Sequence, residues 1–183
     1  PPFFAHRHRI VYSVVETVQT IDEIQHPAVR NVMRELGVDF GVEIHHDGDL
    51  PARSGLGSSS SFTVGLLNAF HAMNGRMASK ESLAREAIRI EQEVIKENVG
   101  SQDQVWAAYG GMNRISFLPD DRFEVSPLIM DIGRRNRLLS NLTLVFTGIS
   151  RFASQVAEKK IANLVARERQ VRRMVEIVDE ATA

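Results

Sequence analysis

The order of strand-like and helix-like segments is the strongest constraint on the fold of this 183-residue chain. Residues 9–18 are rich in β-branched and aromatic side chains, and residues 40–45 alternate apolar with polar ones, so both are predicted as strands. Helical spacing of apolar residues predicts helices over residues 58–73, 80–98 and 153–181. Because strands and helices are mixed without strict alternation, we predict an α+β fold rather than a doubly wound sheet.

Shorter elements complete this prediction. One helix is expected between Pro27 and a stop at Gly37, and another from Ser101 to Tyr109. Strands are expected over residues 112–118, 123–126 and 142–146, the last apolar throughout and therefore central. The length and the lack of an internal repeat or linker predict a single compact unit over residues 1–183.

The composition excludes several kinds of site. The chain has no cysteine, which removes disulfides, thiolate metal sites and cysteine nucleophiles. A formal net charge of −1 gives no electrostatic footprint for nucleic acid or for an acidic membrane. No apolar run reaches the roughly 18 residues of a membrane span, and the start lacks a signal-peptide layout. We therefore expect a cytoplasmic protein with neither nucleic acid nor a membrane as partner.

The segment Pro51–Ser61, with the sequence PARSGLGSSSS, leads directly into a predicted helix. Gly55 and Gly57 let the backbone bend sharply and let a bulky ligand approach its N–H groups. The first helical turn adds free N–H donors and the positive end of the helix dipole, so this is an anion site, most often occupied by phosphate. Its serine hydroxyls can bind phosphate or coordinate Mg²⁺. The alternative is a serine N-cap that follows a glycine turn.

Three other glycine motifs do not fit this segment. A Walker loop requires lysine where Ser58 stands, and the dinucleotide fingerprint requires a third glycine where Ser60 stands. None of the four serines has the flanking glycines of a nucleophile elbow. The segment is therefore predicted to be a phosphate cradle of another lineage.

Two carboxylates add to the cradle. On a helical wheel of about 100° per residue, Glu91 falls within the apolar face of its predicted helix. A buried carboxylate must be paired, protonated or bound to a metal, so a structural ion pair or backbone hydrogen bonds are the alternatives to a metal site. Asp103 follows twelve residues later at a predicted helix start, where the dipole favours the charged form required of a proton acceptor or metal partner. Its alternative role is only to stabilise that helix.

Taken together, these residues resemble the GHMP kinases, which phosphorylate galactose, homoserine, mevalonate and related small molecules. Pro51–Ser61 resembles the second conserved motif of the family. Glu91 and the run Gly-Ser-Gln-Asp-Gln around Asp103 resemble the magnesium-ligand and catalytic segment of the sugar-kinase branch, galactokinase included. Residues 21–29, 91–111 and 146–151 are most similar to the D-glycero-D-manno-heptose 7-phosphate kinases, and the resemblance spans about residues 10–180.

The resemblance implies a GHMP-type fold, in which a part like domain 2 of ribosomal protein S5 is followed by the beginning of the C-terminal domain, with a sub-boundary near residues 127–140. It also implies an ATP- and Mg²⁺-dependent kinase that acts on a sugar or sugar phosphate. Ser58 or Ser59, with Ser59 preferred, would bind Mg²⁺ together with Glu91, and Asp103 would accept the proton of the sugar hydroxyl. The residues implied to hold the nucleotide are Pro51, Gly55, Leu56, Gly57, Ser58, Ser59 and Ser60.

The first and third glycine-rich motifs of the family have no counterpart, since no such motif precedes Arg9 and no glycine follows Gly148. We therefore expect a fragment of a kinase. A non-catalytic phosphate- or nucleotide-binding module, or an inactive kinase fragment, is the rival function. The sequence leaves the oligomeric state open, with a homo-oligomer among the options.

Overall fold

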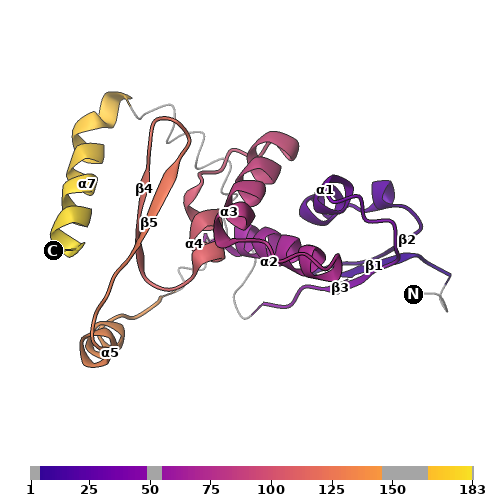
Figure 1. The fold of residues 1–183 in the computed structure, drawn as a ribbon, viewed down its shortest axis with the longest axis horizontal. Coiled ribbons are helices and arrows are strands. Elements are labelled where there is room, and N and C mark those ends of the chain that lie inside the picture. Colours follow the sequence, from indigo (N-terminus) through magenta and orange to yellow (C-terminus); the bar gives the residue numbers. More distant parts are fainter. Residues whose placement is uncertain (1–4, 49–54, 146–164, 183) are drawn as a thin grey trace. The chain divides into compact units, whose positions relative to one another are not determined.

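The computed structural model describes residues 5–48, 55–145 and 165–182. The chain divides into two compact units, Pro1–Tyr109 and Gly110–Ala183 (Figure 1). Strands and helices are mixed within the first unit, so the predicted α+β class is confirmed. The sub-boundary expected near residues 127–140 lies inside the second unit.

The first unit begins with a three-stranded sheet in the order β2-β1-β3. Strand β1 (His8–Val11) pairs antiparallel with β2 (Val15–Val18) and parallel with β3 (Glu43–His45). The strand predicted over residues 9–18 is therefore a hairpin, because the N–H of Tyr12 donates to the carbonyl of Val14 at 2.9 Å and closes a tight turn.

A buried glutamate connects this hairpin to the next helix. The side chain of Glu16 is almost fully buried, and its Oε1 accepts hydrogen bonds from the Tyr12 hydroxyl at 2.9 Å and the His26 N–H at 3.0 Å. Its Oε2 accepts the N–H of Gln25. Burial and this contact with Glu16 raise the pKa of Tyr12. The carboxylate thus fixes the chain that follows the short 3₁₀ turn η1 (Ile21–Glu23).

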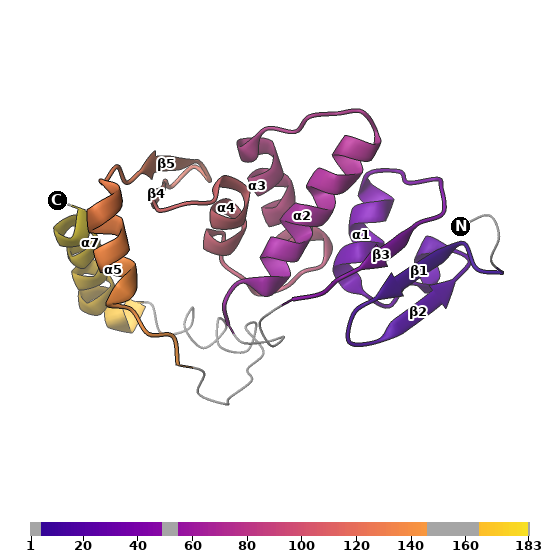
Figure 2. The ribbon, with the colours of Figure 1, turned by 90° about the horizontal axis from the view of Figure 1, so that it is seen from below.

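Helix α1 (Pro27–Glu35) begins with proline in its first turn, as predicted. The N-cap is His26, whose Nδ1 accepts the N–H of Val29 at 3.5 Å. Gly37 follows the helix with a φ of 61°, a left-handed conformation that suits a glycine stop. The helix lies against the sheet through its buried face (Figure 2).

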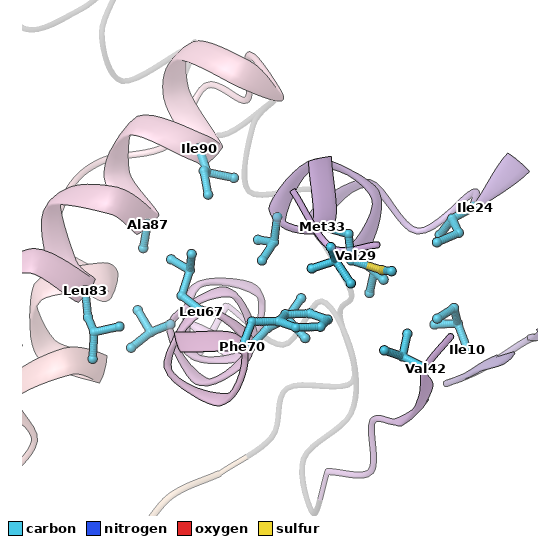
Figure 3. Close-up of a cluster of buried hydrophobic side chains, with 14 residues drawn as sticks. Ile10, Ile24, Val29, Met33, Val42, Leu67, Phe70, Leu83, Ala87 and Ile90 are labelled. Carbon is cyan, nitrogen blue, oxygen red and sulfur yellow. The ribbon is translucent and has the colours of Figure 1, made fainter. Parts of the chain in front are cut away.

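The core of the first unit forms around helix α2 (Ser58–Met73), which has the bounds predicted from the sequence. Leu67 and Phe70 of α2 lie between side chains of α1 and side chains of α3 (Lys80–Arg89), as Figure 3 shows. Helix α3 begins at the predicted cap, since the Ser79 hydroxyl accepts the N–H of Ser82 at 3.0 Å. The core cluster comprises Ile10, Ile24, Val29, Val32, Met33, Val38, Val42, Val64, Leu66, Leu67, Phe70, Leu83, Ala87 and Ile90.

The helix predicted over residues 80–98 is present from residue 80 to residue 94, but its last turn is a π-helix and residues 95–98 are not helical. The α-helix ends at Arg89 and continues as a π-helical turn, η2 (Ile90–Val94), in which the N–H of Ile95 donates to the carbonyl of Ile90 at 2.8 Å. Lys96 then has a φ of 63°, in the left-handed region, so the helical run stops there. Helix α4 (Gln102–Tyr109) closes the unit.

The second unit contains a two-stranded hairpin and two helices among its described residues. The two predicted strands are present as β4 (Asn113–Phe117) and β5 (Phe123–Pro127), and they pair antiparallel. Helix α5 (Ile132–Ser140) is capped by Asp131, whose Oδ1 accepts the N–H of Arg134 at 2.9 Å. The 3₁₀ turn η3 (Val165–Arg167) precedes helix α7 (Glu168–Thr182), and Asp179 of that helix accepts a hydrogen bond from Arg114 at 2.6 Å.

Two predictions for this unit need correction. Helix α5 was not expected, because its apolar residues are few and its cap is a single aspartate. The central strand over residues 142–146 is wrong for residues 142–145, which form no strand and pair with none in the described structure. Leu142, Leu144 and Val145 are instead exposed. Phe146 and the first part of the predicted tail helix, residues 153–164, lie outside the described residues.

Within the described ranges, no helix combines the length and the apolar character needed to cross a membrane.

Acidification should weaken the first unit through His26. Burial, followed by the charge of His46, lowers the pKa of His26 below its ordinary value of 6.5, although Glu16 acts in the opposite direction. The unfolded chain therefore takes up this proton first, so the stabilisation is complete above pH 6.5 and is lost as the pH falls through the lower folded-state pKa. We expect His26→Asn, which keeps a capping side chain, to reduce the fall in Tm between pH 7.5 and pH 5.5.

The control is Gln25→Asn, because Gln25 is the exposed neighbour of His26 and its side chain does not titrate. This variant should keep the wild-type difference in Tm between the two pH values. An unchanged difference in His26→Asn would contradict the role given to His26.

Candidate functional site

The glycine-serine loop meets helix α2 through backbone conformations that favour glycine. Gly55 and Gly57 have φ values of 76° and 71°, both left-handed. Gly57 is itself the N-cap of α2 and has no side chain to offer the helix. The alternative interpretation, in which a serine is the N-cap of this helix, is therefore wrong. The first N–H groups of α2 lack intrahelical partners, so they remain available to an anion.

The serines that follow differ in their surroundings. Ser58 is half-buried, Ser59 is exposed and Ser60 is buried. Leu56 is 45% exposed. Pro51, which was assigned to the same cradle, lies outside the described residues.

Asp103 lies directly beside the loop. A Cβ placed on Gly57 would stand 3.2 Å from the Asp103 Cγ and 3.3 Å from its Oδ2. This carboxylate is in the first turn of α4 and is exposed. Any larger side chain at Gly57 would occupy the space between the N-terminus of α2 and the Asp103 carboxylate.

Glu91, in the π-helical turn η2, is buried close to the N-terminal turn of α2. Its side chain is 1% exposed, and the Ser60 hydroxyl donates to its Oε2 at 2.8 Å. The side-chain amide of Gln104 donates to the same oxygen. The other oxygen, Oε1, is buried and has no hydrogen-bond partner. An unpaired buried carboxylate oxygen is costly, and one explanation for such an atom is a missing ion.

The π-helical turn places a second carboxyl group near Glu91. The N–H of Glu97 donates to the backbone carbonyl of Glu91 at 2.9 Å. Burial and the negative charge of Glu91 raise the pKa of Glu97. A cation bound here would relieve this repulsion between like charges.

The structure brings together most of the residues predicted from the sequence. Gly57, Glu91 and Asp103 all converge at the N-terminus of α2. The serine that contacts Glu91 is Ser60, whereas Ser59 is exposed and accepts the Thr63 hydroxyl through its carbonyl at 3.1 Å. The expectation that Ser59 binds a metal with Glu91 therefore stays a prediction.

Sequence reasoning missed Gln104. Its side chain is 0% exposed, although it directly follows the exposed Asp103. Gln104 lies on the inner side of α4, but the apolar pattern of this short helix is too weak to show from the sequence which side is buried.

The oxygen atoms at this site fit a hard divalent cation. Mg²⁺ prefers oxygen ligands and is usually bound through one or two carboxylates together with phosphate oxygens. Glu91 Oε1 supplies an unpaired carboxylate oxygen close to the first turn of α2. In the described parts of the chain, no group of three or more His, Asp or Glu side chains is arranged to hold a metal ion.

Comparison with known proteins finds similarity to sugar kinases. Residues 22–111 match the family described as GHMP kinases N terminal domain. The D-glycero-alpha-D-manno-heptose 7-phosphate kinase of Campylobacter jejuni is 34% identical over 121 residues, which are 66% of this chain and 36% of that protein. The bifunctional fucokinase/GDP-fucose pyrophosphorylase of Arabidopsis thaliana is 30% identical over 143 residues, which are 76% of this chain and 14% of that protein.

A solved structure gives the same result for the fold. The crystal structure of a D-glycero-D-manno-heptose 1-phosphate kinase from Bacteroides thetaiotaomicron superposes with a TM-score of 0.68 at 25% identity. The match covers 88% of this chain and 58% of that one. The chain thus spans about a third or less of the curated relatives and somewhat more than half of the solved structure.

Removing the Ser60 hydroxyl should destabilise the first unit. Ser60→Ala leaves Glu91 Oε2 with one donor fewer in a buried setting, so the free energy of unfolding should fall by about 1–3 kcal/mol. The adjacent Ser61 is exposed, and Ser61→Ala should change it by no more than about 0.5 kcal/mol. Urea denaturation measures both variants, and equal values would contradict the buried contact.

Proposed function

We propose that this chain, whose residues 22–111 form a GHMP kinase N-terminal domain, belongs to an enzyme that transfers a phosphoryl group from ATP to a hydroxyl group of a sugar or sugar phosphate. The observation that carries the proposal is the position of Asp103, whose carboxylate lies against Gly57 at the start of α2. A phosphate bound at the first turn of α2 would therefore lie beside the Asp103 carboxylate. A group that accepts the proton of the attacking hydroxyl must lie at such a position.

The phosphate groups of ATP would bind at the start of α2. The left-handed glycines Gly55 and Gly57 expose the backbone, and the free N–H groups of the first turn donate to phosphate oxygens. The helix dipole adds positive potential without a lysine. These donors would stabilise the charge on the transferred group, which is the main task of a protein in phosphoryl transfer.

Mg²⁺ would be held by Glu91 with a serine of the same turn. Glu91 Oε1 is the unpaired oxygen available to it, and Ser58 or Ser59, with Ser59 preferred, would supply the hydroxyl ligand. When bound, the ion supplies neutralisation of charge on the phosphate groups. The residues of the chain orient it through the hydrogen bonds that fix Glu91 Oε2.

Asp103 would orient the acceptor hydroxyl and take its proton as the bond to phosphorus forms. The carboxylate is exposed, so an acceptor can reach it. Phosphate binding alone would not need a carboxylate beside Gly57, because a negative charge there opposes an anion. This contact favours a kinase over a non-catalytic phosphate-binding module.

For the acceptor we propose heptose 7-phosphate or a close analogue. The support comes from the similarity to a D-glycero-alpha-D-manno-heptose 7-phosphate kinase and to a heptose 1-phosphate kinase of known structure. Because ATP is the proposed donor, we place the enzyme in the cytoplasm.

Substitution of Gly57 should weaken nucleotide binding. In Gly57→Ala the new Cβ occupies the space beside Asp103, where a phosphate must fit, so the affinity for ATP should fall by roughly tenfold or more. Gly75 has a similar φ of 69° and nothing within 4 Å, so Gly75→Ala has the same backbone strain without the contact. Calorimetry should find wild-type ATP affinity in Gly75→Ala, and equal affinities in the two variants would rule out the cradle.

Substitution of Asp103 should affect turnover rather than binding. Asp103→Asn keeps the size of the side chain but removes the proton acceptor, so kcat should fall by about two to four orders of magnitude while ATP affinity changes only a few-fold. The matched control is Asp39→Asn, an exposed aspartate of the same unit, which should keep wild-type kcat. The assay uses the full-length protein with Mg²⁺, ATP and a panel of free and phosphorylated sugars. Full turnover in Asp103→Asn would exclude this mechanism.

A further inference from the structure

Among the residues that the structure describes, Gln104 is the one fully buried side-chain amide at the site. It is 0% exposed and lies in the first turn of α4, next to Asp103. Its Nε2 donates to Glu91 Oε2, the same oxygen that accepts the hydroxyl of Ser60. Two donors from two different helices therefore hold one oxygen of the buried carboxylate.

The burial of Gln104 is unfavourable for folding by itself. Its Oε1 is buried and has no hydrogen-bond partner, and a buried polar atom without a partner destabilises the folded state. A methionine has a similar length and shape and would avoid this cost. The contact with Glu91 is therefore what an amide provides here that an apolar side chain cannot.

We propose that Gln104 is a positioning residue for Glu91. Its amide and the Ser60 hydroxyl fix the rotation of the carboxylate by engaging Oε2, and this leaves Oε1 free to bind a divalent cation. Hydrogen bonds to the non-coordinating atoms of a metal ligand commonly set its orientation and its affinity for the metal. This inference rests on the proposed kinase function and deepens its account of the metal site.

The position of Gln104 in the chain gives this contact a second consequence. Gln104 and Asp103 are neighbours in the first turn of α4, so the hydrogen bond to Glu91 also holds that turn against α2 and η2. The same side chain therefore connects the proposed cation ligand to the turn that carries the proposed proton acceptor. Loss of the amide should therefore disturb metal binding before it disturbs the phosphate cradle, which is built from the backbone of Gly55 and Gly57.

The test compares nucleotide binding with and without metal in the full-length protein. The variants are Gln104→Met, which removes the donor, and Gln104→Asn, which is one methylene too short to reach Glu91. The affinity for the non-hydrolysable analogue AMPPNP is measured by calorimetry in EDTA, and that for its Mn²⁺ complex by water-proton relaxation. We expect the first to change by less than about threefold and the second to fall by about 10–100-fold.

Gln102→Met is the matched control, because Gln102 is exposed in the same helical turn. It should leave both affinities unchanged. Equal changes in the two affinities, no change in either, or failure of both Gln104 variants to give a cooperative thermal melt would assign Gln104 a structural role and overturn the proposal. Absence of AMPPNP binding in the wild-type protein would instead refute the proposed function itself, and the positioning role with it.

Discussion

The burial of the Glu91 carboxylate is the interaction on which the geometry of the candidate site depends. A charged group with 1% exposure must be satisfied from inside the protein, and here the donors come from Ser60 on α2 and Gln104 on α4. These contacts hold α2, the π-helical turn and α4 at fixed positions around one carboxylate. Glu91 Oε1 has no partner, so this oxygen still requires a hydrogen-bond donor or a cation.

The apolar core gives this polar cluster a rigid support. Leu67 and Phe70 anchor the middle and end of α2 between α1 and α3, so the N-terminus of α2 is presented by a helix that is packed along its length (Figure 3). A site is held more accurately on such an element than on a loop. The close approach of Asp103 to Gly57 depends on this support, because a movement of α2 would change the space between them.

The sequence alone determined the features that depend on local chemistry. The bounds of α2, the Ser79 cap and the left-handed glycines at 55 and 57 follow from helical periodicity and backbone sterics, which act over a few neighbouring residues. The burial of Glu91 was predicted by the same periodicity. The resemblance carried by these residues also indicated the family that residues 22–111 match.

The tertiary structure decided which atoms meet. Whether Ser59 or Ser60 contacts Glu91 depends on how α2 is rotated about its own axis relative to the neighbouring helices. The local sequence does not determine that rotation. The burial of Gln104 likewise arises from packing between segments distant in the sequence, whereas the π-helical turn and the hairpin within residues 8–18 are local features that residue periodicity did not indicate. The sequence therefore determined which side chains are available to the site, and only the folded core determined which of them share a hydrogen bond, because those distances are set by contacts among whole helices.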